Sequence, residues 1–199
     1  MDVSAGSGDI LALYAQGLFP MDEPGSPELP WWTADPRTVF ELDAASRAGV
    51  RRRVRRSLQA AERARPRWEL RLDLAFDDVV RACARPRGPG DGVWLTPRMH
   101  RLYRTLNAMG HAHTFELWAG DALAAGLIAV TIGHAAMLES MFHRVPHAGN
   151  VLIVRTLDAL AGGGCLLCDI QTATEHTLRL GARQIPRAEY EARLRSAIG

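Results

Sequence analysis

The stretch AHTFELWAGDALAAGLIAVTIGHAAMLESMF, residues 112–142, decides the fold. Its alternation and its β-branched and aromatic residues predict three strands, over about 112–118, 122–132 and 135–142. Only the short segments Ala119-Gly120-Asp121 and Gly133-His134 separate them, and glycine favours tight turns. Connections this short join antiparallel neighbours, so we expect these three strands to pair antiparallel.

Helices and further strands flank this stretch on both sides. Thr96 and Pro97 predict the start of a helix that ends at Gly110. The expected elements after the three strands are a helix over 147–161, a strand over 165–170, a helix over 174–180, a strand over 183–185 and a helix over 187–197. The fold class is therefore α+β. The order of elements resembles the acetyltransferase (GNAT) superfold, in which helices flank a mixed sheet.

For the residues before position 90, the sequence predicts a separate, smaller set of helices and strands. The elements expected there are a helix over 7–17, a proline-rich loop over 19–37, a helix over 45–65, a strand over 68–74 and a helix over 75–84. Residues 85–92 are rich in glycine and proline, which is typical of a joint between domains. We therefore expect an N-terminal α/β domain, residues 1–90, followed by a GNAT-like domain, residues 91–199.

Composition limits the class of protein. Of the 199 residues, 47% are hydrophobic and 23% are charged, as in ordinary globular chains. No run reaches the roughly 18 apolar residues of a transmembrane helix, and the first residues do not resemble a signal peptide. Three cysteines are too few for a disulfide framework and indicate a reducing compartment. We expect a cytoplasmic monomer without a membrane partner.

Basic residues are unevenly distributed along the chain. All 24 residues counted as Lys or Arg are arginine. Nine of them lie between Arg47 and Arg67, where Glu62 is the only acidic residue. A compact basic stripe on one helix favours binding of a polyanion, and a solvated helix face is the plainer alternative. The arginines expected to point outward from helix 45–65 are Arg51, Arg52, Arg55 and Arg56.

Polar residues interrupt two apolar segments. Glu139 lies within the strand over 135–142, and Asp169 lies near the end of the strand over 165–170. Gln171 follows Asp169 by two residues, so both side chains leave one face of an extended strand. Buried carboxylates are rare and need a partner or a chemical role. These residues predict a reaction site in the middle of the sheet, with a structural hydrogen-bond network as the alternative.

Metal and coenzyme A sites are both disfavoured. Cys165 and Cys168 are three residues apart, so on a strand they point to opposite faces and cannot bind one metal together. Loop 144–149 corresponds to the acetyltransferase loop that binds pyrophosphate, but Pro146 has no amide hydrogen and His147 replaces a glycine. Nucleotide phosphate-loop motifs are absent from the sequence. We expect no metal and no other cofactor.

Seven motifs follow one another along nearly the whole chain. They are Tyr14-Ala15-Gln16-Gly17-Leu18-Phe19-Pro20, Trp31-Trp32-x-x-Asp35-Pro36-Arg37, Trp94-Leu95-Thr96, Gly110-His111-Ala112-His113-Thr114, Glu139-Ser140-Met141-Phe142-x-Arg144, Asp169-Ile170-Gln171 and Leu180-Gly181-Ala182-x-x-Ile185-Pro186-Arg187. Their order and spacing resemble those of the leucyl/phenylalanyl-tRNA–protein transferases of bacteria. Each motif alone is weak, and the whole series makes the resemblance specific.

This resemblance implies the chemistry. Such an aminoacyltransferase takes Leu or Phe, and less readily Met, from aminoacyl-tRNA. It joins that residue to an acceptor protein with N-terminal Arg or Lys, which marks the acceptor for N-end-rule degradation. The aminoacyl ester is already activated, which agrees with the missing phosphate loop. The resemblance also implies that no metal or coenzyme A takes part. Given a tRNA substrate, the charge of the arginine stripe predicts that its helix faces the tRNA.

Site residues follow from the same resemblance. The implied catalytic residues are Asp169, Gln171 and Glu139; those around the terminal adenosine are Trp32 and Trp94; those of the amino-acid pocket are Leu127, Met141 and Thr156. A carboxylate is suited to orient the attacking amine or take its proton, and a glutamine amide is suited to an oxyanion. Which of Asp169 and Gln171 has which role stays open at this point.

Several positions depart from the family pattern. Leu138 stands where the family has glycine, His143 replaces serine, and Thr156 occupies an aromatic position. These changes leave the exact amino-acid donor open. Two alternatives also stay open: a divergent GNAT-like acyltransferase that uses coenzyme A, and a tRNA-binding relative without catalytic activity.

Overall fold

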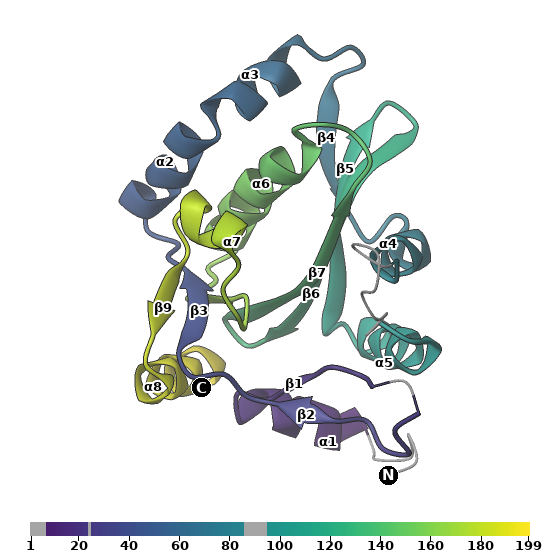
Figure 1. Cartoon of the computed structure of the whole chain (residues 1–199), viewed down its shortest axis with the longest axis vertical. Helices are drawn as coiled ribbons and strands as arrows, with labels where there is room; N and C mark the ends of the chain where they lie inside the picture. The colour runs from purple at the N-terminus through teal and green to yellow at the C-terminus, as the bar shows by residue number, and fades with distance from the viewer. Residues whose placement is uncertain (1–6, 24, 86–94) are drawn as a thin grey trace.

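A seven-stranded mixed sheet runs through the middle of the molecule (Figure 1). The structure, a computed structural model, describes residues 7–23, 25–85 and 95–199. The strand order is β4-β5-β6-β7-β8-β3-β9, and neighbours are antiparallel except for the parallel pair β7 and β8. The strands are β3 (Arg37–Phe40), β4 (Trp68–Leu72), β5 (Ala112–Ala119), β6 (Ala122–Ile132), β7 (Ala135–His143), β8 (Leu167–Asp169) and β9 (Arg183–Ile185).

The central strands β5, β6 and β7 confirm the three strands predicted over 112–142. Gly120 and Gly133 lie in the two turns with φ of +63° and +54°, a backbone region that favours glycine. A Cβ atom at Gly133 would lie 2.7 Å from the carbonyl oxygen of Ala197. This turn therefore also allows the last helix to approach the sheet closely.

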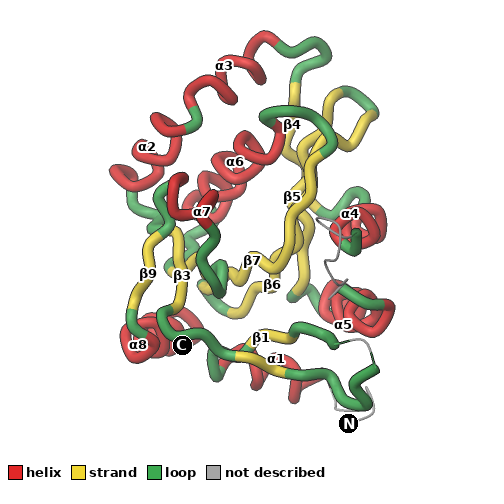
Figure 2. Tube along the Cα trace, viewed as in Figure 1, coloured by secondary structure: helices red, strands yellow, loops and turns green. Residues whose placement is uncertain are grey.

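Helices cover both faces of the sheet (Figure 2). They are α1 (Ser7–Ala15), α2 (Ala44–Arg53), α3 (Arg55–Arg63), α4 (Phe76–Cys83), α5 (Pro97–Ala108), α6 (Ala148–Gly162), α7 (Glu175–Leu180) and α8 (Arg187–Ile198). On one face α6 packs against β5, β6 and β7, and α2 and α3 pack against α6. On the other face lie α4, α5 and α8, with α1 against α8. The α+β class and the mixed sheet with flanking helices are confirmed.

The single helix predicted over 45–65 is wrong. The segment forms two helices, α2 and α3, separated by Val54, whose φ of −104° and ψ of 20° are not helical. Val54 is 4% exposed, and both helices contact α6. The break allows each short helix to turn its own apolar side toward α6, which the regular spacing of apolar residues did not reveal.

The expected loop over 19–37 needs a correction at its end. Residues Phe19–Pro20 (β1) and Trp31–Trp32 (β2) pair as a small antiparallel sheet. Arg37 then begins β3, which lies between β8 and β9 in the main sheet. All four β3 residues are buried. The run Thr38-Val39-Phe40 has strand propensity, but its position directly after a proline-rich loop obscured that signal.

The main sheet includes strands from both sides of residue 90. β3 and β4 come from residues 1–90, and the other strands come from residues 91–199. Separate folding of two domains with a boundary at residue 90 stays a prediction, and residues 86–94 lie outside the described ranges. Among the described residues, no helix combines the length and the apolar character that crossing a membrane requires.

Candidate active site

A cavity of about 280 Å³ lies between the sheet, α6 and the segment that leads into α7. Its lining includes Glu139, Gln171, Leu127 and Met141, four of the residues that the sequence singled out. The other lining residues are Phe40, Leu138, Ser140, Ile153, Ile170, Thr172, Thr174, His176 and Thr177. The structure therefore brings one carboxyl group, one amide and an apolar wall together in a single cavity.

Glu139 is directed by an irregularity in β7. Ile128 pairs with Ser140 and Ala129 pairs with Leu138, so Glu139 has no partner on β6 and forms a bulge. Bulges change the direction of a side chain and occur often beside active sites. Glu139 thus interrupts the regular alternation of side chains along β7, and it does so at the cavity.

The carboxyl group of Glu139 is poorly satisfied. Tyr103 donates its hydroxyl to Oε2 at 3.2 Å. The buried Oε1 meets no donor in good hydrogen-bond geometry among the described residues, although the Tyr14 hydroxyl also stabilises the charged carboxylate. Burial raises the pKa of Glu139 to about 8, and the negative charge of Asp169 acts in the same direction. Glu139 therefore holds a proton at neutral pH.

Gln171 lies just beyond the end of β8 with a left-handed backbone, φ +57°. Its carbonyl oxygen accepts the amide of Thr38 at 3.0 Å, and its own amide donates to Oδ1 of Asp169 at 2.8 Å. When the side-chain amide is assigned in the orientation that satisfies its surroundings, its nitrogen donates to the carbonyl oxygens of Leu138 and Ile170, each at 3.0 Å. Both amide protons are thereby used, so the side-chain oxygen is the group left for a ligand.

Asp169 does not line the cavity, although it touches the backbone of Gln171. It is 0% exposed and forms an ion pair with Arg37, whose Nη2 lies 2.6 Å from Oδ2. Arg37 Nε lies 3.0 Å from Oδ1, and the Tyr190 hydroxyl donates to Oδ2 at 2.9 Å. Because each oxygen already accepts at least two hydrogen bonds, Asp169 has little capacity to accept a substrate proton.

Arg37 is the functional residue that the sequence reasoning missed. It is 1% exposed, its Nη1 donates to the carbonyl oxygen of Gly17 at 2.9 Å, and its guanidinium lies 4.4 Å from the centre of the Tyr190 ring. Burial opposes the charge of Arg37, but Asp169 raises its pKa overall. The motif Asp35-Pro36-Arg37 contained this residue, and only the contact with Asp169 reveals its task.

The predicted amino-acid pocket is only partly reflected in the cavity. Leu127 from β6 and Met141 from β7 line it, as expected of apolar walls. Thr156 on α6 is 0% exposed and does not line it, whereas Ile153, one turn earlier, does. The hydroxyl of Thr156 is buried and has no hydrogen-bond partner within the described ranges. Its place in a donor pocket stays a prediction.

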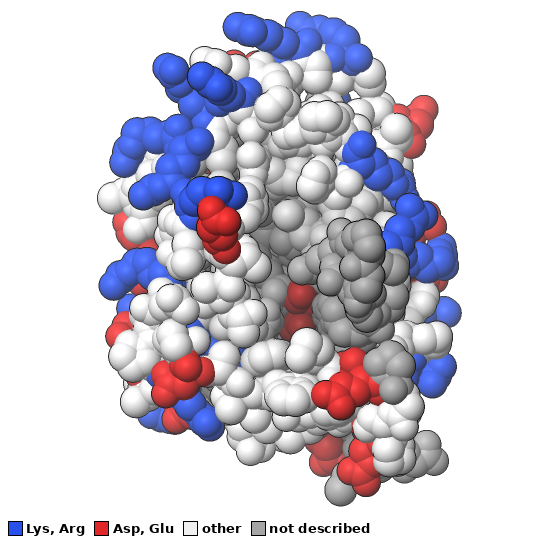
Figure 3. All heavy atoms as spheres, in the orientation of Figure 1, with Lys and Arg blue, Asp and Glu red and all other residues white. Residues whose placement is uncertain are grey.

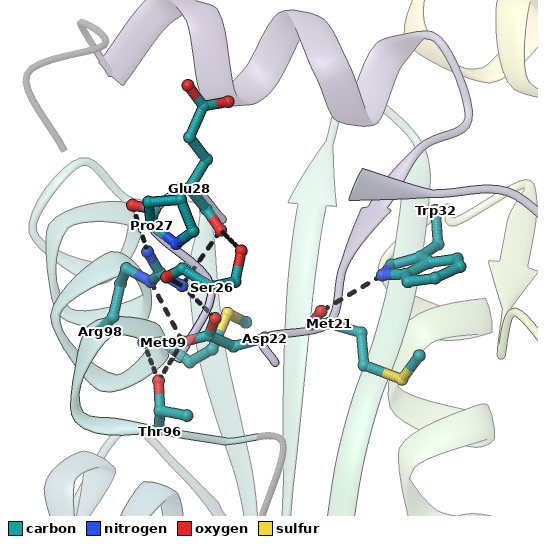
Figure 4. A network of polar contacts seen from close by, with 9 residues as sticks. All are labelled: Met21, Asp22, Ser26, Pro27, Glu28, Trp32, Thr96, Arg98 and Met99. Carbon is teal, nitrogen blue, oxygen red and sulfur yellow. Dashed lines mark hydrogen bonds and ion pairs between the residues drawn. The ribbon is translucent and has the colours of Figure 1, made fainter. Parts of the chain in front are cut away.

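The two adjacent tryptophans differ in their surroundings. Trp31 packs edge-on against Tyr14, with ring centres 5.4 Å apart. Trp32 is 39% exposed, and its Nε1 donates to the carbonyl oxygen of Met21 at 3.2 Å (Figure 4). Trp32 thus presents an aromatic surface in a fixed position. Trp94 lies outside the described residues.

A network of polar contacts ties the loop before Trp32 to the start of α5 (Figure 4). Asp22 accepts hydrogen bonds from the Thr96 hydroxyl and from the guanidinium of Arg98. Arg98 also donates to the carbonyl oxygen of Pro27 at 3.2 Å. Burial works against the charge of Asp22, yet the bonds from Arg98 and Thr96 lower its pKa. Thr96 caps α5 as predicted, with its hydroxyl accepting the amide of Met99.

The predicted arginine stripe lies on the surface of α2 and α3. Its residues Arg51, Arg52, Arg55 and Arg56 are all exposed. Figure 3 shows basic side chains gathered over these helices, at the upper left of the view. Arg51 forms an ion pair with Asp158 of α6, and the other three form none with the described residues. The stripe therefore presents positive charge that the described residues do not neutralise.

The described residues contain no cluster of three His, Cys, Asp or Glu side chains suited to a metal ion. Cys168 is buried and Cys165 is partly buried. Burial raises the pKa of both thiols. Their surroundings therefore favour the neutral thiol over the thiolate that a metal requires.

Comparison with known proteins gives consistent matches. The sequence profile of the leucyl/phenylalanyl-tRNA protein transferase family matches residues 44–195. The leucyl/phenylalanyl-tRNA–protein transferase of Anaeromyxobacter sp. (strain K) is 45% identical over 190 residues, which cover 95% of this chain and 78% of that protein. The protein with the same name from Nitratidesulfovibrio vulgaris (strain DP4) is 41% identical over 189 residues, 94% and 77% of the two chains. A solved C-terminal DUF2156 domain from Agrobacterium fabrum is 12% identical, covers 94% of this chain and 60% of that one, and has a TM-score of 0.44.

Proposed function

Because the chain belongs to the leucyl/phenylalanyl-tRNA protein transferase family, we propose that it transfers leucine or phenylalanine from aminoacyl-tRNA to the N-terminus of an acceptor protein. It is an aminoacyltransferase, because relatives that align with nearly its whole length carry the name of such an enzyme. One observation at the site supports the chemistry above the others. Glu139, whose pKa is raised to about 8, and Gln171 line one partly apolar cavity.

In the proposed reaction, the neutral α-amine of the acceptor attacks the carbonyl carbon of the aminoacyl ester. The new C–N bond forms as the bond between that carbon and the terminal ribose oxygen breaks. The amine loses a proton, and the departing ribose oxygen gains one. An ester is already activated, so the step needs no nucleotide hydrolysis.

Glu139 is the proposed proton carrier of this step. Its pKa of about 8 lies close to the ordinary value of about 7.7–8.0 for an α-amine, so a proton passes between the two groups at little cost. Glu139 lines the cavity, and we propose that its carboxyl group faces the attacking nitrogen there. Glu139 begins protonated, so its carboxyl group gives its proton to the departing ribose oxygen and takes one from the attacking nitrogen, and it ends in the form in which it began.

Gln171 is proposed to hold the amine rather than the oxyanion. Its amide protons are bonded to Leu138 and Ile170, so its oxygen is the atom suited to accept an N–H of the amine. Asp169 acts behind it as a positioning residue. It binds the backbone amide of Gln171 and is itself fixed by Arg37 and Tyr190. For the question that the sequence left open, the proposal thus gives Gln171 the contact with the substrate and Asp169 the supporting role.

The finer substrate claims are also proposals. We propose acceptors with N-terminal Arg or Lys, degradation by the N-end rule, a monomeric enzyme and a cytoplasmic location, where aminoacyl-tRNA is made. Trp32 is proposed to stack on the terminal adenosine, since base stacking on an aromatic ring is worth about 1–3 kcal/mol. Arg51, Arg52, Arg55 and Arg56 are proposed to bind phosphates of the acceptor arm.

A transfer assay with separately charged tRNAs tests the function. Labelled Leu-tRNA and Phe-tRNA are each mixed with a peptide that begins with Arg and a matched peptide that begins with Ala. We expect label on the Arg peptide only, without added nucleotide. Absence of transfer from both tRNAs overturns the proposal. Acetylation of the same peptide by acetyl-CoA is the outcome that favours the GNAT-like alternative.

The arginine stripe is tested by binding at several salt concentrations. Changing Arg51, Arg52, Arg55 and Arg56 together to Gln should weaken binding of every tRNA. Each lost phosphate contact should reduce the slope of log K against log salt by about 0.7–0.9. An unchanged slope means that the stripe is only a solvated helix face.

A further inference from the structure

A second cavity, of about 370 Å³, lies away from Glu139 and Gln171, between α3, β4 and α6. Its volume falls within the roughly 300–1,000 Å³ of small-molecule sites. We call it the arginine cavity and define it by its lining residues, which are Arg51, Leu58, Ala61, Glu62, Arg67, Trp68, Val154 and Arg155. None of these lines the candidate active site.

Arg155 is the central observation. It comes from α6, is partly buried, and donates Nη1 to the carbonyl oxygen of Trp68. It forms no direct ion pair with any described residue; burial lowers the pKa of its guanidinium, and the more distant charge of Glu69 only partly opposes this. Charged side chains that leave water are normally paired. Arg155 therefore has guanidinium protons and a charge to offer to a ligand in the cavity.

The remaining polar wall is also positive. Arg67 is exposed and has no ion pair within the described part of the chain, and Arg51 is paired with Asp158. Glu62 is the only carboxylate of the lining. Two guanidinium groups without a direct ion pair at one cavity favour an anion, and guanidinium groups match the geometry of phosphate oxygens.

The rest of the wall is apolar. Leu58, Ala61 and Val154 line the cavity together with the partly buried ring of Trp68. A small inorganic anion gains nothing from contact with an apolar wall, whereas the planar base of a nucleotide can pack against it. The combination of arginines with an indole and aliphatic side chains thus matches a phosphate that is attached to a flat, apolar group.

We propose that the arginine cavity is a nucleotide site, in which Arg155 and Arg67 bind a phosphate and the base packs against Trp68. The nucleotide comes either from an RNA strand or from a free mononucleotide. The RNA source rests on the proposed function, because the strand is then part of the tRNA substrate. The mononucleotide source is independent of it. The site lies beside the arginine stripe and shares only Arg51 with it.

Equilibrium binding of two probes tests the site. One probe is adenosine monophosphate, and the other is an uncharged RNA minihelix with a tRNA acceptor stem. Each is titrated into the wild-type chain, Arg155→Gln, Arg67→Gln and the control Arg195→Gln. Arg195 is an exposed arginine of α8, which covers the opposite face of the sheet.

We expect Arg155→Gln to weaken one probe by about tenfold or more, the usual effect of losing a charge-assisted hydrogen bond. Arg195→Gln should leave both affinities unchanged. A loss confined to the minihelix identifies RNA as the source, and for it the log–log salt slope should fall by about 0.7–0.9. A loss with adenosine monophosphate identifies a free nucleotide. Arg67→Gln, at an exposed side chain, gives the same test if Arg155→Gln does not fold.

Two results overturn the inference. The first is that neither probe binds the wild-type chain, and the second is that both arginine variants bind like the control. Failure of the proposed function looks different: the wild-type chain then shows no transfer, while adenosine monophosphate still binds and still depends on Arg155. The binding measurement therefore separates the two claims.

Discussion

Glu139 and Asp169 are carboxyl groups buried in neighbouring strands of one sheet, and their surroundings differ. Asp169 lies on β8 and accepts hydrogen bonds from Arg37, Tyr190 and the Gln171 backbone. Glu139 lies on β7 and accepts one well-formed hydrogen bond, from Tyr103, while its Oε1 meets no donor in good geometry among the described residues. Burial alone therefore does not identify a reacting group. The difference lies in the lone pairs that the fold leaves unused.

The bulge in β7 explains how one sheet contains two carboxyl groups with such different surroundings. Met137 pairs with Asp169 across the parallel strands, so Asp169 lies in regular sheet structure beside β3. Glu139 is the extra residue of the bulge, two positions later on β7. Asp169, in regular strand pairing, has its hydrogen-bonding capacity filled, whereas Glu139, at the bulge, has not. Each prediction below tests that division.

The largest effect is expected at Arg37. Arg37→Leu leaves Asp169 buried without its cation, and breaking a buried ion pair from one side costs about 3–5 kcal/mol. Denaturation in urea measures the loss. Arg179→Leu is the matched control, because its pair with Glu175 is exposed and such pairs contribute about 0–1 kcal/mol. Equal losses in the two variants would show that Asp169 is not held by its ion pair.

The next largest effect is expected at Gln171, which lines the cavity. Gln171→Met keeps the length of the side chain and removes the amide, so we expect kcat for transfer to fall by about 10²-fold or more. Affinity for tRNA should stay near the wild-type value. Gln184→Met, at an exposed glutamine of β9, is the control. Wild-type kcat in Gln171→Met would remove this residue from the reaction.

The pH dependence of stability distinguishes Glu139 from an ordinary surface carboxylate. Its pKa is 4.5 in an unfolded chain and about 8 in the folded protein, so between these values the folded state holds a proton that the unfolded state has lost. Stability of the wild-type chain should therefore fall as pH rises from about 4.5 to about 8.

Glu139→Gln removes this titration. Its Tm relative to the wild type should rise progressively across the same pH range, while transfer activity falls. Parallel Tm curves for the two proteins from pH 4.5 to 8.5 would contradict the raised pKa. Increased stability at pH 8 together with lost transfer is the pattern that we expect of a residue kept for function.

Much of this arrangement was accessible from the sequence, and the missing part has a physical reason. The spacing of apolar residues predicted the strands over 112–142, and the polar residues inside apolar runs identified Glu139 and Asp169. The different surroundings of Glu139 and Asp169 depend on Arg37 and Tyr190, which lie 132 and 21 residues from Asp169 in the chain. Contacts so distant in the chain, like the bulge at Glu139, have no local signature.

The smallest effect tests whether the same contrast extends to neutral side chains of α6. Ile153 lines the cavity, and Thr156 is buried behind it with an unpaired hydroxyl. Ile153→Ala should change the ratio of kcat/KM for Phe-tRNA and Leu-tRNA by about tenfold, since a pocket wall discriminates by about 1–3 kcal/mol. Thr156→Val removes a buried polar group without a partner, so it should raise stability by about 1 kcal/mol and leave that ratio unchanged. If Thr156→Val shifts the ratio as much as Ile153→Ala does, Thr156 belongs to the donor pocket and the wall extends deeper than the cavity between the sheet and α6.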